Sequence, residues 1–356
     1  MTICYLVDYD LNSNSGVVQK ILQQSSFWSK SGYDFYLVST KTLAIYDKNK
    51  DEIFKIKPFD INFGRLSTAL RVLYNSFFLI KLLDYIKFDI LYMRYMLYTP
   101  WLASILKKYT VVMEINSDDI LEYKLHSKIT YAYNMLTRNF ILKKVDGFVT
   151  VSRELKIKFD CFKKPIEVIA NGVDVSRYKV LLNKNEKPIL VFIGTPDQAW
   201  HGLDKIITIA ENLKNCKFYI IGIDGKNTSN IKYFGYLNSE ESTKIIQQCD
   251  IGIGTLSLYK KGLNEASPLK TRQYLACGLP VIYAYVDTDL DDSSISLRLN
   301  NNENNINHDS IKNFVDRVFN DYNVKKRARK FAEEKLDFSI KEKKRLEFFE
   351  RVVNAK

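Results

Sequence analysis

The chain has 356 residues, of which 46% are hydrophobic and only seven are prolines. This composition excludes a disordered protein and suits two α/β domains of ordinary size, each with its own core. The formal net charge is +12, but the basic residues are spread along the chain without a nucleic-acid motif, so we expect no nucleic-acid partner. The basic balance also suits phosphate-bearing substrates and the anionic inner face of a bacterial membrane.

Neither a signal peptide nor a membrane-spanning helix is predicted. No basic leader precedes a short apolar segment, and no apolar run reaches the roughly eighteen residues that a span requires. We therefore expect a cytoplasmic protein, with the inner membrane face as a candidate peripheral docking surface. The five cysteines are far apart and form no C-x-x-C or Cys/His cluster, which argues against disulfides and structural zinc.

The first half of the chain alternates strand-like and helical segments. An apolar strand at residues 3–8 precedes a helix that begins at Gly16 and ends near residue 30. The longest helical segments are 66–87 and 119–143. Further strands are predicted at 35–39, 53–56, 89–94, 110–115 and 147–151. This is a doubly wound pattern, in which ligands bind at the carboxyl ends of the strands.

The second half repeats the same alternation after a polar linker at residues 182–187. Before this linker, a helix begins near Ser152 and a strand follows at 166–170. The second series of strands is predicted at 189–194, 218–222, 231–234, 251–255 and 280–284. The chain ends in helices, of which the last is predicted at 340–353.

Residues 264–282, NEASPLKTRQYLACGLPVI, combine an anion pocket with an acid at its edge. Ser267 suits a helix N-cap and Pro268 suits the first helical position. The amides of Leu269 and Lys270, the helix dipole and the Lys270 ammonium would then favour a phosphate in front of the helix. Glu265 lies just outside. These cues alone are equally typical of an ordinary capped helix in an α/β sheet.

The same segment resembles the signature of retaining GT-B glycosyltransferases related to family 4. The shared pattern is an acid, then Pro-Leu-Lys, Tyr-Leu-Ala and Gly-x-Pro-Val-Ile. The resemblance implies an α/β GT-B fold, with two Rossmann-like doubly wound domains facing across a cleft. It implies an acceptor-side domain at 1–175, on which a helix at 340–356 packs back, and a nucleotide-sugar domain at 176–339.

The resemblance also implies the chemistry. A sugar moves from a nucleotide-diphosphate donor, UDP- or GDP-linked, to a glycan or polyprenyl-linked acceptor with retention of configuration, and no metal or other cofactor takes part. Glu265 would orient the donor sugar, while Lys270 and His201 would stabilise the leaving diphosphate. Gln273 stands where relatives have a second acid that holds the ribose. Further donor contacts are expected from Gly194, Thr195, Leu237, Lys261, Ser267, Pro268, Leu269, Arg272 and Gln273.

In the first domain, the Asn14-Ser15-Gly16 turn resembles the glycine-containing loop that faces the donor in this family. Arg94 ends one predicted strand, and Glu114, Asn116 and Asp118 follow the end of another. Strand ends are where an acceptor would meet the donor. Asp118 is equally suited to be the N-cap of the next helix.

Two alternatives stay open at this point. Asp287-Thr288-Asp289 has the Asp-x-Asp spacing of a metal-dependent GT-A transferase. The departures at Gln273, Thr195 and His201 would also suit a transferase-like subunit that has lost activity. By resemblance, the setting is the assembly of a bacterial surface polysaccharide.

Overall fold

The structure is a computed structural model that describes residues 1–13, 15–59, 65–182, 185–303 and 306–356, with only the backbone described at 65–69 and 126. The chain divides into two compact units. Unit 1 comprises Met1–Ile169 and Glu342–Lys356, and unit 2 comprises Ala170–Lys341. The resemblance predicted the two transitions at 175/176 and 339/340, whereas the structure has them at 169/170 and 341/342.

The described part of unit 1 contains one eight-stranded sheet in the order β4-β3-β2-β1-β5-β6-β7-β8. Neighbouring strands are parallel, except that β3 is antiparallel to both β2 and β4. The strands are β1 (Thr2–Val7), β2 (Asp34–Ser39), β3 (Ala44–Tyr46), β4 (Glu52–Lys55), β5 (Ile90–Arg94), β6 (Val111–Ile115), β7 (Gly147–Thr150) and β8 (Ile166–Val168). The β3 strand is an addition to the predicted set, because three residues are too few to show an alternating pattern.

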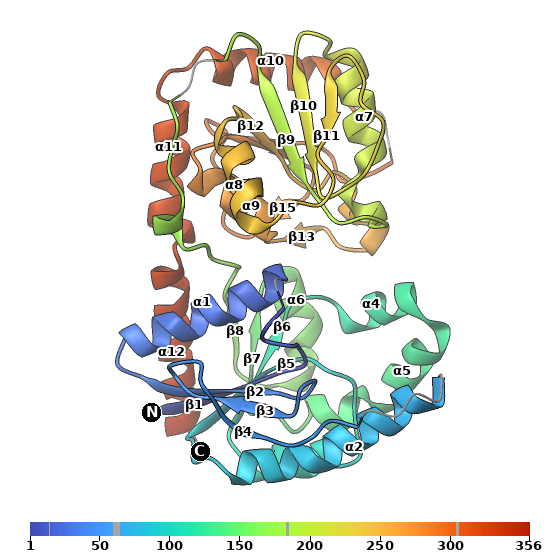
Figure 1. Ribbon diagram of the computed structural model, residues 1–356, viewed down its shortest axis with the longest axis vertical. Helices are drawn as coiled ribbons and strands as arrows, with labels where there is room; N and C mark the ends of the chain where they lie inside the picture. The colour runs from blue at the N-terminus through green and yellow to red at the C-terminus, as the bar shows by residue number, and fades with distance from the viewer. Residues whose placement is uncertain (14, 60–64, 183–184, 304–305) are drawn as a thin grey trace. The chain divides into compact units, whose positions relative to one another are not determined.

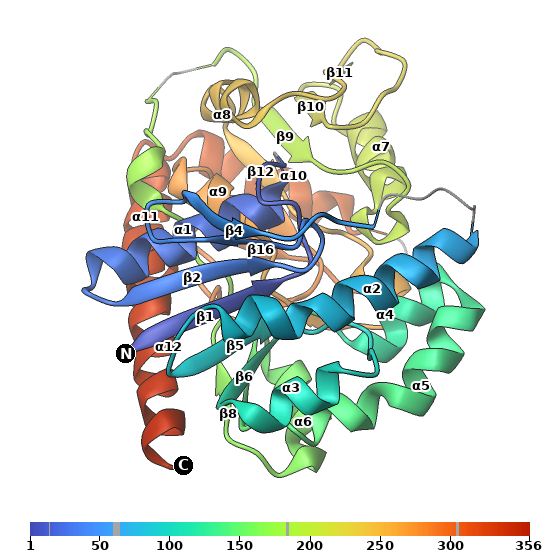
Figure 2. The same cartoon turned by 60° about the horizontal axis from the view of Figure 1, so that its bottom comes forward.

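Helices cover both faces of this sheet (Figures 1 and 2). Alternate residues of β1 point to opposite faces: Cys4 and Leu6 pack with α2, α3, α5 and α6, whereas Ile3 and Tyr5 pack with α1 and α12. The helices of unit 1 are α1 (Gly16–Lys30), α2 (Arg65–Asp84), α3 (Leu102–Lys108), α4 (Asp119–His126), α5 (Lys128–Leu142), α6 (Arg153–Phe159) and, from Glu342 onward, α12 (Phe338–Asn354). The short helix η1 spans Asp160–Phe162.

The helix predicted at 119–143 is wrong as a single element. Ser127 adopts an extended conformation, with φ −163° and ψ 130°, and ends α4. Its side chain then caps α5 by accepting a hydrogen bond from the Thr130 amide. A serine competes well for backbone hydrogen bonds, so it starts a new helix more readily than it continues an old one.

The last helix supplies part of the unit 1 core. Phe349 and Val352 of α12 pack in the same cluster as Trp28 of α1. The Trp28 indole donates a 2.9 Å hydrogen bond to Glu342, which also pairs with the buried Arg345. A buried carboxylate needs such partners to offset its loss of hydration.

Unit 2 contains a six-stranded sheet in its described residues, in the order β11-β10-β9-β12-β14-β16. All of its neighbouring strands are parallel. The strands are β9 (Ile189–Ile193), β10 (Lys217–Ile221), β11 (Ile231–Tyr233), β12 (Ile251–Ile253), β14 (Val281–Tyr283) and β16 (Ser296–Arg298). A separate parallel pair joins β13 (Glu265–Ala266) to β15 (Val286–Asp287).

The unit 2 helices pack around this sheet (Figure 1). The α-helices are α7 (Leu203–Asn212), α8 (Ser239–Gln247), α9 (Leu269–Ala276), α10 (His308–Phe319) and α11 (Val324–Phe331). The shorter turns are η2 (Val175–Arg177), η3 (Ala199–His201), η4 (Leu258–Lys261) and η5 (Ala332–Leu336). The predicted α/β fold class with doubly wound sheets is confirmed for both units.

Each sheet has one point where the strand order reverses. In unit 2 this switch point lies between β9 and β12, and in unit 1 it lies between β1 and β5. Loops leave the two strands of a switch point in opposite directions, so a crevice opens at their carboxyl ends, where ligands bind in open α/β sheets. The candidate sites are therefore expected after β9 and β12 in one unit and after β1 and β5 in the other.

Candidate functional site

The helix α9 is anchored beside the unit 2 switch point by Tyr274. Its ring packs against Gly252 of β12, where a Cβ atom would lie 2.3 Å from the ring. The Tyr274 hydroxyl accepts a 2.8 Å hydrogen bond from the amide of Ile193, at the end of β9. These two contacts hold α9 against β12 and the carboxyl end of β9.

Lys270, His201 and Phe192 form a compact group that we term the Lys270 cluster. The Lys270 Nζ lies 4.1 Å from the centre of the Phe192 ring, and the His201 ring packs edge-on against the same ring at 5.4 Å. Gly194 makes this approach feasible, because a Cβ atom there would lie 2.5 Å from Phe192 and 2.9 Å from His201 Nδ1. Residues from β9, η3 and α9 thus converge on one place.

The nitrogens of this cluster are buried. Within the described residues, neither Lys270 Nζ nor His201 Nδ1 has a hydrogen-bond partner. Burial lowers the pKa of Lys270 to about 7. The pKa of His201 is lowered to about 3 by burial and, second, by the positive charge of Lys270, while a backbone hydrogen bond with Thr195 acts in the opposite direction. An anion placed against these nitrogens would raise both pKa values and satisfy both groups.

The start of α9 differs by one residue from the predicted start. Pro268 is the N-cap, with φ −66° and ψ 139°, and Leu269 is the first helical residue. The Ser267 hydroxyl instead accepts a 3.2 Å hydrogen bond from the Asn171 amide, and the Ser267 carbonyl accepts a 2.8 Å bond from the Asn171 side chain. The capping role predicted for Ser267 is therefore wrong, because a tertiary contact uses its side chain.

Glu265 lies just before this helix start, in β13. It is 9% exposed, and its strand pairs in parallel with β15. The short strand pair fixes the backbone of Glu265 two residues before Ser267. The predicted proximity of an acid to the amino end of the helix is thus present in the structure.

Arg272 is the predicted donor-binding residue that the structure removes. It is fully buried, and its guanidinium pairs through both terminal nitrogens with Asp287. It also contacts Asp289 at 3.1 Å, and its Nε donates to the carbonyl of Asn171. Four of its five N–H donors are thus used by these partners, so the role of Arg272 is to hold α9 on the β15 segment rather than to bind a diphosphate.

The same contacts explain the Asp-x-Asp motif. Asp287 is held by Arg272, and Asp289 forms a 2.7 Å ion pair with Lys341. Both carboxylates are thus occupied by cations of unit 2. In the part of the chain that the structure describes, no group of three or more His, Cys, Asp or Glu side chains could hold a metal ion.

The remaining unit 2 candidates lie around the cluster or farther along the sheet edge. Gln273 donates a 3.2 Å hydrogen bond to Thr243 of α8. Lys261 lies over the Trp200 ring at 4.9 Å, and Thr195 is exposed. Leu237 precedes the capping box of α8 and is half-buried.

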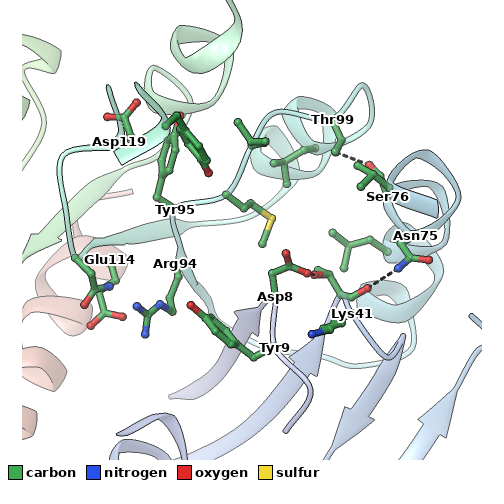
Figure 3. Close-up of a pocket in the computed structure, with 18 of the residues that line it drawn as sticks. Asp8, Tyr9, Lys41, Asn75, Ser76, Arg94, Tyr95, Thr99, Glu114 and Asp119 are labelled. Atoms are coloured by element: carbon green, nitrogen blue, oxygen red, sulfur yellow. Dashed lines mark hydrogen bonds between the residues drawn. The ribbon is translucent and has the colours of Figure 1, made fainter. Parts of the chain in front are cut away.

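A cavity of about 530 Å³ lies at the unit 1 switch point (Figure 3). The predicted acceptor residues Arg94, Glu114 and Asn116 all line it. Asp118 does not belong to its lining: it caps α4 by accepting from the Leu121 amide at 3.0 Å and pairs with Lys158. The alternative role of Asp118 as an N-cap is therefore confirmed, and the substrate-binding role predicted for it is wrong.

Glu114 is a fully buried carboxylate at the base of this cavity. It pairs with Lys20 of α1 at 2.8 Å and accepts a 3.1 Å hydrogen bond from the Tyr5 hydroxyl. Burial by itself would raise the pKa of Glu114, but the charges of Lys20, Arg94 and Arg345 hold that pKa well below its usual range. Glu114 thus stays ionised and fixes the neighbouring cations.

The Asn14-Ser15-Gly16 turn is only partly described. Asn14 lies outside the described residues. Ser15 caps α1 by accepting a hydrogen bond from the Val18 amide. A Cβ atom at Gly16 would meet nothing within 4 Å, so packing within the described structure does not require glycine there.

Comparisons with known proteins agree with this architecture. Residues 14–177 match the family described as Glycosyltransferase Family 4. Sucrose-phosphate synthase from Thermosynechococcus elongatus has a similar fold over the whole of both chains, with a TM-score of 0.75 and 12% identity. The chain thus has the GT-B fold of these structures, and its first half is similar to Glycosyltransferase Family 4.

Two further solved structures share the fold of this chain. A glycosyltransferase from Rickettsia africae matches with a TM-score of 0.67 and 14% identity, covering 100% of this chain and 99% of the other. HepE of Anabaena, solved in complex with UDP and glucose, matches with a TM-score of 0.68 and 14% identity, covering 99% and 100%. No curated protein matches the chain in sequence.

Several residues that line the unit 1 cavity were not predicted. Tyr9 lies two residues after β1, and Lys41 lies two residues after β2, so their positions after strands were a usable signal. The residues on α2 had no such signal, since polar side chains on one helix face are typical of solvent exposure. The polar and aromatic lining residues missed are Asp8, Tyr9, Thr40, Lys41, Arg71, Asn75, Ser76, Tyr95, Thr99, Ser117, Asp119, Glu122 and Tyr123.

Proposed function

We propose that this glycosyltransferase moves a sugar from a nucleotide-diphosphate donor, with UDP favoured over GDP, to a glycan or polyprenyl-linked acceptor. The Lys270 cluster carries this proposal. Two buried nitrogens without hydrogen-bond partners among the described residues lie at the switch point of a parallel sheet, beside the start of a helix. That arrangement is suited to a diphosphate, and the similar HepE of Anabaena was solved with UDP and glucose.

The proposed mechanism stabilises the charge that develops on the leaving diphosphate. Lys270 and the first amides of α9 hold the phosphate oxygens, and His201 becomes protonated as negative charge approaches. Glu265 accepts hydrogen bonds from the donor sugar and orients it. Transfer proceeds with retention of configuration, as the resemblance to family 4 implies.

The proposed reaction requires no metal. The supporting observation is the occupied state of the Asp287-Thr288-Asp289 motif, in which Asp287 pairs with Arg272 and Asp289 pairs with Lys341. Replacing either cation by a divalent metal would leave a buried or half-buried Arg or Lys without its partner, at a cost of several kcal/mol by order of magnitude. The cationic residues of the Lys270 cluster perform the role that a metal has in GT-A enzymes.

We further propose that unit 1 docks on an anionic membrane surface. On α4 and α5, Leu125, Ile129, Leu136 and Phe140 are 54%, 81%, 78% and 57% exposed. The last three follow helical spacing and give one apolar stripe on α5. Exposed lysines flank this stripe at Lys124, Lys128, Lys143 and Lys144. An apolar stripe with basic flanks suits shallow insertion between acidic lipid headgroups.

No described helix is both long and apolar enough to cross a membrane. We therefore propose reversible, peripheral association at the inner face of a bacterial membrane. Assembly of a surface polysaccharide on a lipid carrier is the setting that this location and the family resemblance support.

A thermal-shift screen of UDP-, GDP-, ADP- and TDP-sugars tests the donor proposal, because a ligand that binds only the native state raises the melting temperature. We expect the largest shift from a UDP-sugar, and a smaller shift for the Lys270→Met protein with the same donor. The absence of any shift from all four donor classes would contradict the proposal.

A further inference from the structure

The cavity of unit 1 has more positive charge than its own carboxylates neutralise. Three cations line it: Lys41, Arg71 and Arg94. Among the lining acids, Glu114 is neutralised by Lys20 at 2.8 Å. Asp119 is neutralised by the guanidinium of Arg138, at 2.7 and 2.8 Å.

The two other acids of the lining have hydroxyl partners. Asp8 accepts a 2.6 Å hydrogen bond from Thr40, and Glu122 accepts one from Ser117. Three cations therefore remain against two carboxylates. The cavity as a whole favours a ligand with negative charge.

Among these three cations, Arg94 is the one best prepared to bind a ligand. Its Nη1 atom is buried and has no hydrogen-bond partner among the residues described. The guanidinium lies 5.5 Å from the centre of the Tyr9 ring. Its neighbouring acid, Glu114, already pairs with Lys20 and lies 4.0 Å from Arg345.

A buried guanidinium nitrogen without a partner is costly, because it has lost its hydration without gaining a hydrogen bond. A carboxylate or phosphate group removes this cost best, since its paired oxygens match the two parallel N–H donors of arginine. Arg94 is thus prepared for an anionic oxygen group rather than for a neutral hydroxyl.

The groups around Arg94 suit the rest of a sugar ring. Figure 3 shows Arg94 between Tyr9, Tyr95 and Glu114, with Asp8 and Lys41 on the opposite side of the cavity. Aromatic faces at Tyr9 and Tyr95 can cover the apolar face of a sugar. The Asp8 carboxylate can accept hydrogen bonds from sugar hydroxyls.

We propose that the acceptor sugar bound in this cavity carries an anionic oxygen group, either a uronic acid carboxylate or a sugar phosphate, which Arg94 holds. This inference rests on the proposed function, because it takes the cavity to be the acceptor site. It adds the substrate class: an acidic rather than a neutral acceptor glycan. Arg94 acts as a specificity-determining residue for that class.

Equilibrium binding to the full-length protein tests the inference without requiring turnover. Glucuronic acid, glucose 6-phosphate and glucose are titrated separately by ligand-observed NMR at pH 7, and UDP is titrated in parallel. We expect at least one acidic sugar to bind roughly tenfold more tightly than glucose, the ratio that one charge-assisted contact provides. Preference for glucuronic acid identifies the carboxylate, and preference for glucose 6-phosphate identifies the phosphate.

Substitution at Arg94 assigns the preference to that side chain. Arg94→Gln should abolish the preference for acidic sugars and leave UDP binding unchanged, while Arg94→Lys should keep part of the preference. Lys107→Gln, which removes an exposed cation of α3 outside the cavity, is the matched control and should change neither. Arg94→Lys also covers the case in which the glutamine protein fails to fold.

Two results would overturn the inference. One is UDP binding with equal or absent binding of all three sugars, which removes the acidic acceptor and leaves the donor proposal intact. The other is an acidic preference that survives in both Arg94 variants. Absence of UDP binding together with an acidic-sugar preference would instead overturn the proposed donor and keep the anionic cavity.

Discussion

Replacement of Lys270 by methionine should weaken donor binding and stabilise the protein without donor. Burial beside Phe192 lowers the pKa of Lys270 to about 7, well below the value of about 10.4 for an unperturbed lysine. The unfolded chain therefore binds more protons than the folded chain between these two pKa values. The stability of the wild type rises with pH across this window, and at pH 7 or below it carries the full cost of burying the ammonium. Methionine fills the same space without that cost.

The donor should reverse this cost, because its diphosphate favours the charged form of Lys270. A charge-assisted hydrogen bond contributes about 1.5 to 3 kcal/mol, so Lys270→Met should raise the Kd for a UDP-sugar by roughly ten- to a hundredfold at pH 6. Above pH 7, Lys270 of the free wild-type protein is mostly neutral, so donor binding must be accompanied by the uptake of a proton. The Kd should thus rise about tenfold between pH 6 and pH 8, and the methionine protein should lack this dependence.

Isothermal titration calorimetry with a UDP-sugar between pH 6 and pH 9 measures the Kd, and differential scanning calorimetry of the free protein measures its melting temperature. A UDP-sugar is a better probe than UDP, since its diphosphate does not titrate near neutral pH. Lys214→Met, on an exposed surface of unit 2, is the matched control and should change neither quantity. A donor Kd that is independent of pH in the wild type, or a Lys270→Met protein with a lower melting temperature and an unchanged Kd, would refute the reasoning.

The other predictions concern rate, donor affinity, stability and membrane binding. Glu265→Ala should lower kcat by on the order of a hundredfold with an unchanged melting temperature, because its proposed contact belongs to the reacting sugar; an unchanged kcat would remove Glu265 from the donor-sugar site. Gln273→Glu should lower the donor KM by about tenfold if this side chain accepts from the ribose; an unchanged or higher KM removes Gln273 from the ribose site. Arg272→Met should destabilise the protein by about 3 to 5 kcal/mol in urea unfolding, because Asp287 is left buried without its partner; a loss under about 1 kcal/mol would contradict that pairing. Leu136→Asp on the exposed α5 stripe should reduce flotation with anionic vesicles at low salt, and binding equal to the wild type would exclude this stripe as the docking surface.

Local sequence patterns were sufficient for the fold class and for most elements. Continuous apolar runs marked β1, β5 and β9, since both faces of a buried parallel strand are covered by helices. The predicted α1, from Gly16 to residue 30, has the same bounds in the structure. The Pro-Leu-Lys segment likewise located a helix start, the cation of that start and an acid beside it, because all three depend on neighbours a few residues apart.

Only the tertiary structure decided which charged side chains pair with one another. The sequence offers Arg272 and Lys270 as equivalent cations on one short helix, yet Arg272 is consumed by Asp287 while the Lys270 ammonium lies over Phe192. Likewise, Glu114 meets Lys20 and Arg345 from helices that are 94 and 231 positions away in the sequence. Charge and helix position are properties of the local chain, but desolvation and pairing depend on what distant strands bring alongside. For this reason the sequence could name the residues of a diphosphate site, and only the packed sheet could decide which of their charges remain available to a ligand.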